Sequence, residues 1–242
     1  MNDRILVLNG MSYAPAVEGL GEIVYDEKDF FNNPDKYKLV LFTGGEDVSP
    51  RLYEERSPKG QCWANPLRDA QEKAVFDVAL KSNTLMTGIC RGVQFLNVMA
   101  GGRLMHHISG HSGSRHIMKT TVGGHRITVN SLHHQMVIPS ENAEIIAVSE
   151  KRLSDIYVGN YDVEIDYYNA EVEAAIFPKI GAFGVQYHPE MMAKQSDGYI
   201  YFHNMVRNAL NHDWRVFVAA YTEGLDDVHF LKVRRDDSSV SG

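Results

Sequence analysis

The sequence predicts a single α/β domain with one open, mostly parallel β-sheet, flanked by helices and extended by antiparallel strands. Three observations predict this class. Short apolar runs recur in the first 90 residues, a helical pattern joins two of them, and shorter β-rich segments follow after about residue 120. A length of 242 residues suits one such domain.

The first half of the chain supplies the parallel strands. Residues 4–8, 38–42 and 84–89 are apolar runs of the kind that a strand buried on both faces requires. Between the last two, residues 67–82 place apolar side chains at steps of three and four, which predicts a helix with one buried face. Strand, helix and strand with short connections form the βαβ unit of a parallel sheet.

The second half is richer in short β segments separated by Gly, Asn and Pro. We expect antiparallel additions to the same sheet, or a small second sheet, at residues 126–129, 145–148, 162–167 and 172–177. Residues 200–210 predict a closing helix, and residues 214–221 predict one more short helix. We therefore divide the chain into a main domain, 1–212, and a C-terminal extension, 213–242, whose polar last seven residues are expected to fray.

Composition excludes several classes of protein. The 24 Lys and Arg against 31 Asp and Glu give a net charge of −7, which argues against a nucleic-acid binder. Two cysteines, Cys62 and Cys90, are too few for a disulfide framework and suit a reducing compartment. The apolar run at residues 5–8 is too short for a signal peptide or a membrane span. We expect a cytoplasmic protein with no membrane partner.

The stretch Gly88-Ile89-Cys90-Arg91-Gly92 is the most informative in the chain. A predicted strand runs directly into a helix through a turn with glycine on either side of a cysteine, which holds a nucleophile exposed. The helix that begins at Arg91 directs free N–H groups toward the sulfur and favours the thiolate. The alternative is a buried core cysteine, the usual place of a free Cys. Cys62 lies in a polar, loop-like stretch and is given no chemical role.

A proton-transfer partner for Cys90 follows the apolar segment at residues 182–185. His188 and Glu190 lie two residues apart at a predicted strand end, where Pro189 disfavours a helix. A carboxylate there can accept a hydrogen bond from one imidazole nitrogen and leave the other to exchange a proton with sulfur. The order Cys, His, Glu differs from the nucleophile, acid, histidine order of α/β-hydrolases, which are therefore disfavoured.

Two glycines, Gly44 and Gly45, end the second predicted strand. They let the backbone approach a ligand at the edge where parallel sheets bind ligands. A backbone N–H there, together with that of Arg91, would form an oxyanion hole. An ordinary glycine-rich turn is the alternative.

The histidines do not predict a metal centre. His133 and His134 are adjacent, and the remaining candidates are scattered over His106, His107, His111 and His116. A zinc site needs three or four ligands at workable spacing, and neither C-x-x-C nor H-E-x-x-H occurs. We expect no metal and no other cofactor.

Five motifs over residues 4–210 resemble, in their order, the class I glutamine amidotransferase superfamily, and within it the γ-glutamyl hydrolase branch that includes γ-glutamyl-GABA hydrolases. The motifs are Gly44-Gly45-Glu46-Asp47-Val48-x-Pro50-x-x-Tyr53, Arg68-Asp69-x-x-Glu72, Gly88-Ile89-Cys90-Arg91-Gly92-x-Gln94-x-x-Asn97-x-x-x-Gly101-Gly102-x-Leu104, Asn130-Ser131-x-His133-His134-Gln135 and Gly184-Val185-Gln186-Tyr187-His188-Pro189-Glu190.

The resemblance implies a flavodoxin-like sheet and a triad of Cys90, His188 and Glu190. The cysteine would attack a γ-glutamyl amide, release an amine or ammonia, and leave a glutamyl thioester for water to hydrolyse. The oxyanion would lie at the backbone N–H groups of Gly45 and Arg91.

The resemblance also implies a binding site for the α-amino and α-carboxylate groups of the glutamyl substrate. Gln94 and the backbone near His134 and Gln135 would form it. Asp69 and Glu72 belong to a motif typical of the branch but receive no chemical step.

Three functions stay open at this point. The first is a free-standing hydrolase of a small γ-glutamyl compound, and the second is a glutaminase subunit that passes ammonia to a separate synthetase or transferase. The third is an inactive module that binds a metabolite. The segment between His116 and Asn130 is shorter than in the hydrolase branch, and the chain extends beyond the usual end after Trp214, which leaves the substrate open. The oligomeric state also stays open, a homo-oligomer included.

Overall fold

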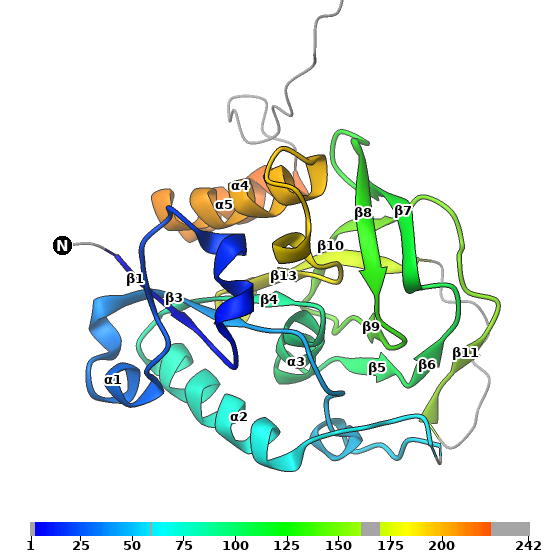
Figure 1. Ribbon diagram of the computed structural model, residues 1–242, viewed down its shortest axis with the longest axis horizontal. Coiled ribbons are helices and arrows are strands. Elements are labelled where there is room, and N and C mark those ends of the chain that lie inside the picture. Colours follow the sequence, from blue (N-terminus) through cyan, green and yellow to red (C-terminus); the bar gives the residue numbers. More distant parts are fainter. Residues whose placement is uncertain (1–2, 59, 161–169, 224–242) are drawn as a thin grey trace, which may run out of the picture.

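A computed structural model of the chain describes residues 3–58, 60–160 and 170–223 (Figure 1). One mixed sheet of nine strands runs through the centre, in the order β2-β1-β3-β4-β13-β12-β10-β7-β8. The antiparallel segments therefore extend the parallel sheet and do not form a separate large one. The predicted segments at 162–167 and 236–242 lie outside the described residues.

The sheet changes from parallel to antiparallel at β13. The parallel strands are β1 (Arg4–Val7), β2 (Glu22–Val24), β3 (Tyr37–Phe42), β4 (Leu85–Ile89) and β13 (Ala182–Val185). The antiparallel strands are β12 (Val172–Phe177), β10 (Glu144–Ser149), β7 (Ser112–Thr120) and β8 (Arg126–Leu132). The predicted fold class is confirmed, with both kinds of pairing in one sheet.

Two short ribbons accompany the large sheet. One pairs β5 (Arg103–Met105) with β9 (Met136–Ile138), and the other pairs β6 (His107–Ile108) with β11 (Tyr157–Val158). Short 3₁₀ segments occupy Met11–Val17, Pro34–Lys36, Pro50–Tyr53, Pro178–Ile180 and Pro189–Met191.

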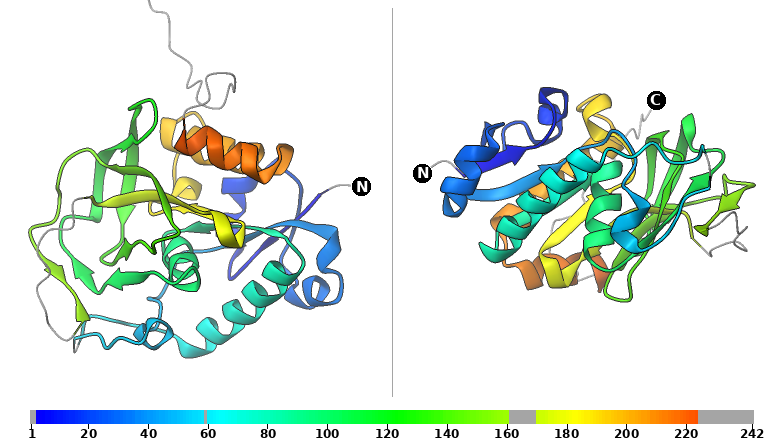
Figure 2. Two further views of the ribbon diagram at one scale, coloured as in Figure 1. Left: turned by 180° about the vertical axis from the view of Figure 1, so that it is seen from behind. Right: turned by 90° about the horizontal axis from the view of Figure 1, so that it is seen from below.

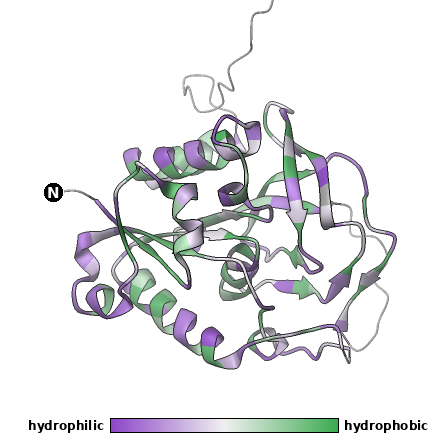
Figure 3. Ribbon diagram, viewed as in Figure 1, coloured by the Kyte–Doolittle hydropathy of each residue, from purple (hydrophilic) through white to green (hydrophobic). Residues whose placement is uncertain are grey.

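Helices cover both faces of the sheet (Figure 2). They are α1 (Glu27–Asn32), α2 (Pro66–Lys81), α3 (Arg91–Met99), α4 (Asp197–Asn211) and α5 (Trp214–Thr222). Side chains of α4 and α5 join one core cluster, and those of α1, α2 and α3 join the other. The parallel strands are mostly hydrophobic, whereas the helices alternate in character (Figure 3), as layers packed on a buried sheet require.

The short helix of the C-terminal extension packs on its own chain. Phe217 is fully buried and its ring lies 5.2 Å from that of Phe183 on β13, centroid to centroid. Trp214 Nε1 donates a hydrogen bond of 3.0 Å to the carbonyl oxygen of Pro178. The apolar and aromatic side chains of α5 thus pack on the protein's own core, with Phe217 and Tyr221 buried and Trp214 and Val218 partly buried. The division at 212/213 stays a prediction. None of the helices within the described ranges is both long and apolar enough to cross a membrane.

Candidate active site

Cys90 lies at the carboxyl end of β4 in a strained backbone conformation. Its φ is 53° and its ψ is −110°, which is unusual for a residue with a Cβ, and such a conformation costs about 1–3 kcal/mol. A hydrogen bond of 2.9 Å from its backbone N–H to the carbonyl of Val185 ties the turn to β13. The side chain is largely buried, and Cys90 immediately precedes α3. This is the geometry of a nucleophile on a strand-to-helix turn.

Glycines allow α3 to approach the strands beneath it. A Cβ added to Gly92 would lie 2.0 Å from the carbonyl oxygen of Phe42 on β3. A Cβ on Gly88 would lie 2.3 Å from the backbone of Gly92. Any side chain at either position would push the helix away from the sheet, so the two glycines that flank Cys90 set the position of the turn.

His188 and Glu190 follow β13, the strand beside β4. His188 Nδ1 lies 2.7 Å from Glu190 Oε1, and both side chains are more than nine-tenths buried. The backbone of His188 is held by one side chain, because Asn130 Oδ1 accepts from its N–H at 2.8 Å and Asn130 Nδ2 donates to its carbonyl at 3.0 Å. With Nδ1 bound to Glu190, the other ring nitrogen, Nε2, is the one available to Cys90.

The environment of His188 favours its charged form. Burial lowers its pKa, but hydrogen-bonding and charge interactions with Cys90 and Glu190 outweigh burial and raise the pKa from 6.5 to about 10. The geometry therefore supports an imidazolium beside the sulfur at neutral pH, in which Glu190 orients the ring and balances its charge.

The Gly44-Gly45 turn lies against this histidine. A Cβ on Gly44 would be 3.0 Å from His188 Cε1 and 2.5 Å from the hydroxyl oxygen of Tyr13. Gly45 has a φ of 134°, which residues with a side chain rarely adopt. On the other side, Arg91 is the first residue of α3, so its backbone N–H has no acceptor within the helix. The two expected oxyanion donors thus belong to the turns that carry the site.

The expected substrate-binding residues are only partly brought together. Gln94 Nε2 donates to the carbonyl oxygen of Gln135 at 3.1 Å and to Gln186 Oε1 at 3.2 Å. His134 instead pairs its Nε2 with Asp47 Oδ1 at 3.0 Å, and its ring lies edge-on to Trp63.

The sequence patterns did not predict a buried network of charged side chains that lies beside the Gly44-Gly45 turn and the turn at Cys90. The Arg91 guanidinium forms ion pairs with Asp69 and Glu72, and Arg68 pairs with Glu72 at 2.9 Å. Exposed Glu46 is a further partner of Arg68 at 2.7 Å, and this contact lowers the pKa of Glu46 to about 2. The motif spacing of Arg68, Asp69 and Glu72 on one helix was the only signal of it.

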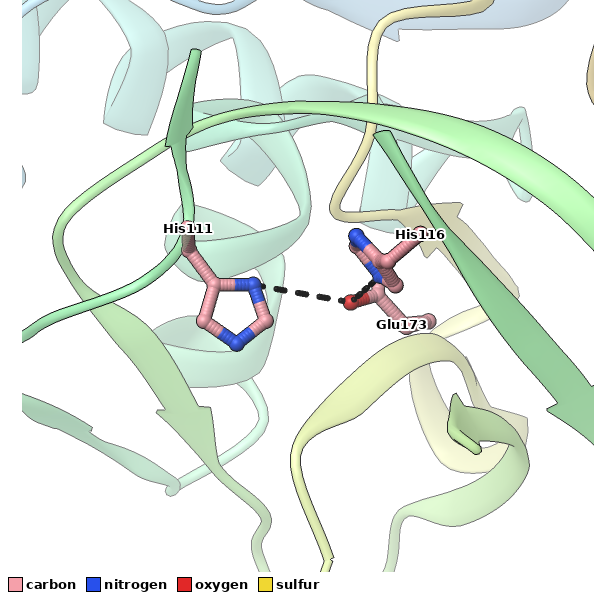
Figure 4. A group of neighbouring side chains, drawn as sticks. All are labelled: His111, His116 and Glu173. Atoms are coloured by element: carbon pink, nitrogen blue, oxygen red, sulfur yellow. Dashed lines mark hydrogen bonds and ion pairs between the residues drawn. The ribbon is translucent and has the colours of Figure 1, made fainter. Parts of the chain in front are cut away.

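A second buried group, His111, His116 and Glu173, also escaped prediction (Figure 4). Their nearest donor atoms all lie within 4.8 Å of one another, a His₂Glu set of the type that zinc uses. Glu173 Oε1 lies 2.7 Å from His116 Nε2 and 3.8 Å from His111 Nδ1, while His111 Nε2 lies 3.1 Å from Glu171. Each imidazole thus has a carboxylate partner, and these contacts join β7 and its N-terminal approach to β12.

Comparisons with known proteins agree with this architecture. The family model described as Peptidase C26 matches residues 24–190. The glutamine amidotransferase-like protein YvdE of Lactococcus lactis is 32% identical over 173 residues, 67% of this chain and 69% of that protein. Protein NtpR of Enterococcus hirae is 26% identical over 178 residues, 65% of this chain and 68% of its own length.

Solved structures share the fold at low sequence identity. PurLQS from Thermotoga maritima superposes with a TM-score of 0.53 at 15% identity, covering 93% of this chain and 99% of that one. A glutamine amidotransferase from the same organism gives 0.50 at 15% identity, with 92% and 91% covered. The family match spans every residue from the Gly44-Gly45 turn to Glu190. The chain belongs to the Peptidase C26 family and, through it, to the class I glutamine amidotransferase superfamily of hydrolases and amidotransferases.

Proposed function

We propose that the protein hydrolyses γ-glutamyl amide bonds through a glutamyl thioester on Cys90. The observation that carries the proposal is the cysteine on a strained turn at the end of β4, in contact with a histidine whose other nitrogen is bound to Glu190. Membership in the Peptidase C26 family supports an amide-hydrolysing enzyme. The γ-glutamyl specificity and the thioester are the parts that we propose.

In the first half-reaction, the thiolate of Cys90 attacks the γ-carbonyl carbon of the substrate. A carbon–sulfur bond forms and the carbonyl oxygen becomes an oxyanion, for which the backbone N–H groups of Gly45 and Arg91 are the proposed donors. The oxyanion then reforms the carbonyl and the C–N bond breaks. The imidazolium of His188 gives its Nε2 proton to the leaving nitrogen, so that an amine or ammonia departs. The acyl group remains on sulfur as a thioester.

In the second half-reaction, water attacks the thioester. Neutral His188 takes a proton from the water as the new carbon–oxygen bond forms, and the same donors hold the second oxyanion. Cleavage of the carbon–sulfur bond releases glutamate and restores the thiolate beside the imidazolium. Glu190 keeps its hydrogen bond to Nδ1 throughout, because it orients the ring and stabilises its charged form.

Substrate selection is proposed to lie with the glutamyl part of the molecule. Gln94 and the backbone near His134 and Gln135 are the proposed contacts for its α-amino and α-carboxylate groups. Gln94 and Gln135 are almost fully buried and bonded to each other, which supports a rigid pocket wall.

A glutaminase subunit is the second candidate, and a relative favours it. The carbamoyl phosphate synthase small chain of Helicobacter pylori is 25% identical over 160 residues, which are 64% of this chain but 39% of that protein. Under this second candidate function, the substrate of the present protein is glutamine, and the ammonia passes to a separate synthetase. An inactive binding module is disfavoured by the complete set of Cys90, His188 and Glu190 in one site.

The test is to incubate the protein with a panel of γ-glutamyl amides, glutamine included, and to measure hydrolysis as the release of free glutamate. Wild type and Cys62→Ala should turn over the same members of the panel, whereas Cys90→Ala should turn over none. Activity on several γ-glutamyl amines supports the hydrolase, and activity on glutamine alone supports the glutaminase. A wild-type protein that releases glutamate from no member, or a Cys90→Ala variant that keeps its activity, contradicts the proposed function.

A further inference from the structure

The side chain of Arg68 binds the backbone of the Gly44-Gly45 turn through hydrogen bonds. Its Nη2 donates to the carbonyl oxygens of Thr43 at 3.0 Å and Gly44 at 2.8 Å. The side chain is nine-tenths buried, and it comes from the first turn of α2, where Asn65 caps the helix. A guanidinium from a helix therefore binds two successive carbonyls at the end of β3.

These contacts determine the direction of one particular N–H group. The carbonyl of Gly44 and the N–H of Gly45 belong to one planar trans peptide, so they point in opposite directions. Because Arg68 binds the carbonyl, the N–H of Gly45 is turned away from Arg68. A peptide flanked by two glycines is otherwise free to rotate at low cost. Gly45 also packs directly on Arg68, since a Cβ there would lie 2.2 Å from Nη1.

Glu72 connects this clamp to the second turn of the site. Its Oε1 accepts from Arg68 Nε at 2.9 Å and from Asn9 Nδ2 at 2.7 Å, and its Oε2 binds the guanidinium of Arg91. Asp69 is the other partner of Arg91, and it also accepts from the backbone N–H of Ser49 at 3.1 Å. One carboxylate thus binds the side chains associated with both expected oxyanion donors.

We propose that Arg68 is a positioning residue that keeps the Gly44–Gly45 peptide oriented with its N–H toward the oxyanion, and that Glu72 holds Arg68 in register with Arg91. The inference rests on the proposed function, because it concerns the oxyanion hole of that reaction. Arg68 acts through the backbone and does not touch the substrate. It gives the motif Arg68-Asp69-x-x-Glu72 a role that spacing alone did not reveal.

A purely structural role for Arg68 makes a different prediction. If Arg68 only balanced the charge of buried Glu72, its loss would disturb the whole site, and every reaction of Cys90 would slow together. A positioning role affects only those steps in which an oxyanion forms. Alkylation of the thiolate by iodoacetamide forms no oxyanion, so it separates the two roles.

The experiment compares wild type with Arg68→Gln and Arg68→Lys, and uses Glu46→Gln as the matched control. Glu46→Gln alters the exposed partner of Arg68 but leaves its bonds to both carbonyls and to Glu72 in place. Each protein is assayed for kcat and KM on γ-glutamyl-p-nitroanilide, for the rate of Cys90 alkylation by iodoacetamide, and for melting temperature.

We expect Arg68→Gln to lower kcat by about 10²–10³-fold, the usual effect of one lost oxyanion donor, with little change in KM or in alkylation rate. Arg68→Lys should lose less, because an ammonium can still reach one carbonyl, and Glu46→Gln should match wild type. If kcat is unchanged in folded Arg68 variants, the positioning role of Arg68 is overturned and the proposed function stands. The same conclusion follows if kcat and the alkylation rate fall in parallel. If Arg68→Gln does not fold, the same two outcomes are read from Arg68→Lys. A wild type that cleaves no γ-glutamyl amide overturns the proposed function and this inference with it.

Discussion

Replacing Asn130 by alanine removes both hydrogen bonds that hold the backbone of His188, at 2.8 Å and 3.0 Å. Each such bond contributes about 0.5–1.5 kcal/mol net, so the pair contributes about 1–3 kcal/mol to folding. For a chain of this size, that loss lowers the melting temperature by about 2–12 °C. The larger effect should be on the reaction, because a shift of about 1 Å in a reacting group can cost about 10²-fold in rate.

The assay pairs Asn130→Ala with Asn130→Asp, and measures kcat on the substrate found and the melting temperature of each protein. Aspartate keeps an acceptor for the N–H of His188 but cannot donate to its carbonyl, so its loss of kcat should be intermediate. If Asn130→Ala melts at a lower temperature and keeps full kcat, then Pro189, Glu190 and the strand alone position His188, and the reasoning is refuted.

Three further predictions follow from the same geometry. His188→Ala should lose about 10²–10⁴-fold in kcat, more than Glu190→Ala, because the histidine moves protons in both half-reactions while the glutamate only orients it. Equal losses of kcat in folded variants would contradict this assignment of roles. Because the pKa of His188 is raised to about 10, its stabilising contribution should be complete below pH 6.5 and disappear as pH rises through about 10. NMR titration of the His188 ring and urea unfolding from pH 6 to above pH 10 check this, and a titration midpoint near 6.5 would contradict it. Phe217→Ala should destabilise the fold by about 3–5 kcal/mol in urea unfolding and leave iodoacetamide labelling of Cys90 unchanged, since Phe217 is fully buried in α5. Slower labelling of the folded variant would show that the extension, 213–242, helps to form the site.

The parallel strands β1, β3 and β4 were predictable because they are buried on both faces. Residues 4–8 and 38–42 carry continuous apolar runs, and they form β1 and β3 within one residue of the expected bounds. By contrast, β2 is three residues long and partly exposed, and β7 is a polar segment, Ser112–Thr120. Neither shows a period or an apolar run, so they depend on their neighbours in the sheet and left no local signal.

The candidate site divides in the same way. The places of Cys90 and His188 at strand ends were predictable, because the glycines around Cys90 and the proline after His188 mark turns in the sequence. The catalytic roles of Cys90, His188 and Glu190 stay predictions. The hydrogen bonds from Arg68 to the carbonyl oxygens of Thr43 and Gly44 could not be predicted from the sequence. They depend on where α2 lies relative to β3, which only the folded chain determines.

Packing also explains the histidine group that spacing argued against. His111 and His116 meet Glu173 because β7 and β12 belong to the same sheet, although some 60 residues separate them in sequence. Spacing rules find ligands that lie close together in sequence, and they do not detect such a set.

The covalent intermediate on Cys90 is the central claim, and acid-quenched mass spectrometry during turnover of a γ-glutamyl amide tests it most directly. We predict one glutamyl group on the peptide that contains Cys90, released by hydroxylamine as a thioester should be, and no such group after Cys90→Ser. A glutamyl group on Cys62, or undiminished turnover by Cys90→Ser, would contradict the claim.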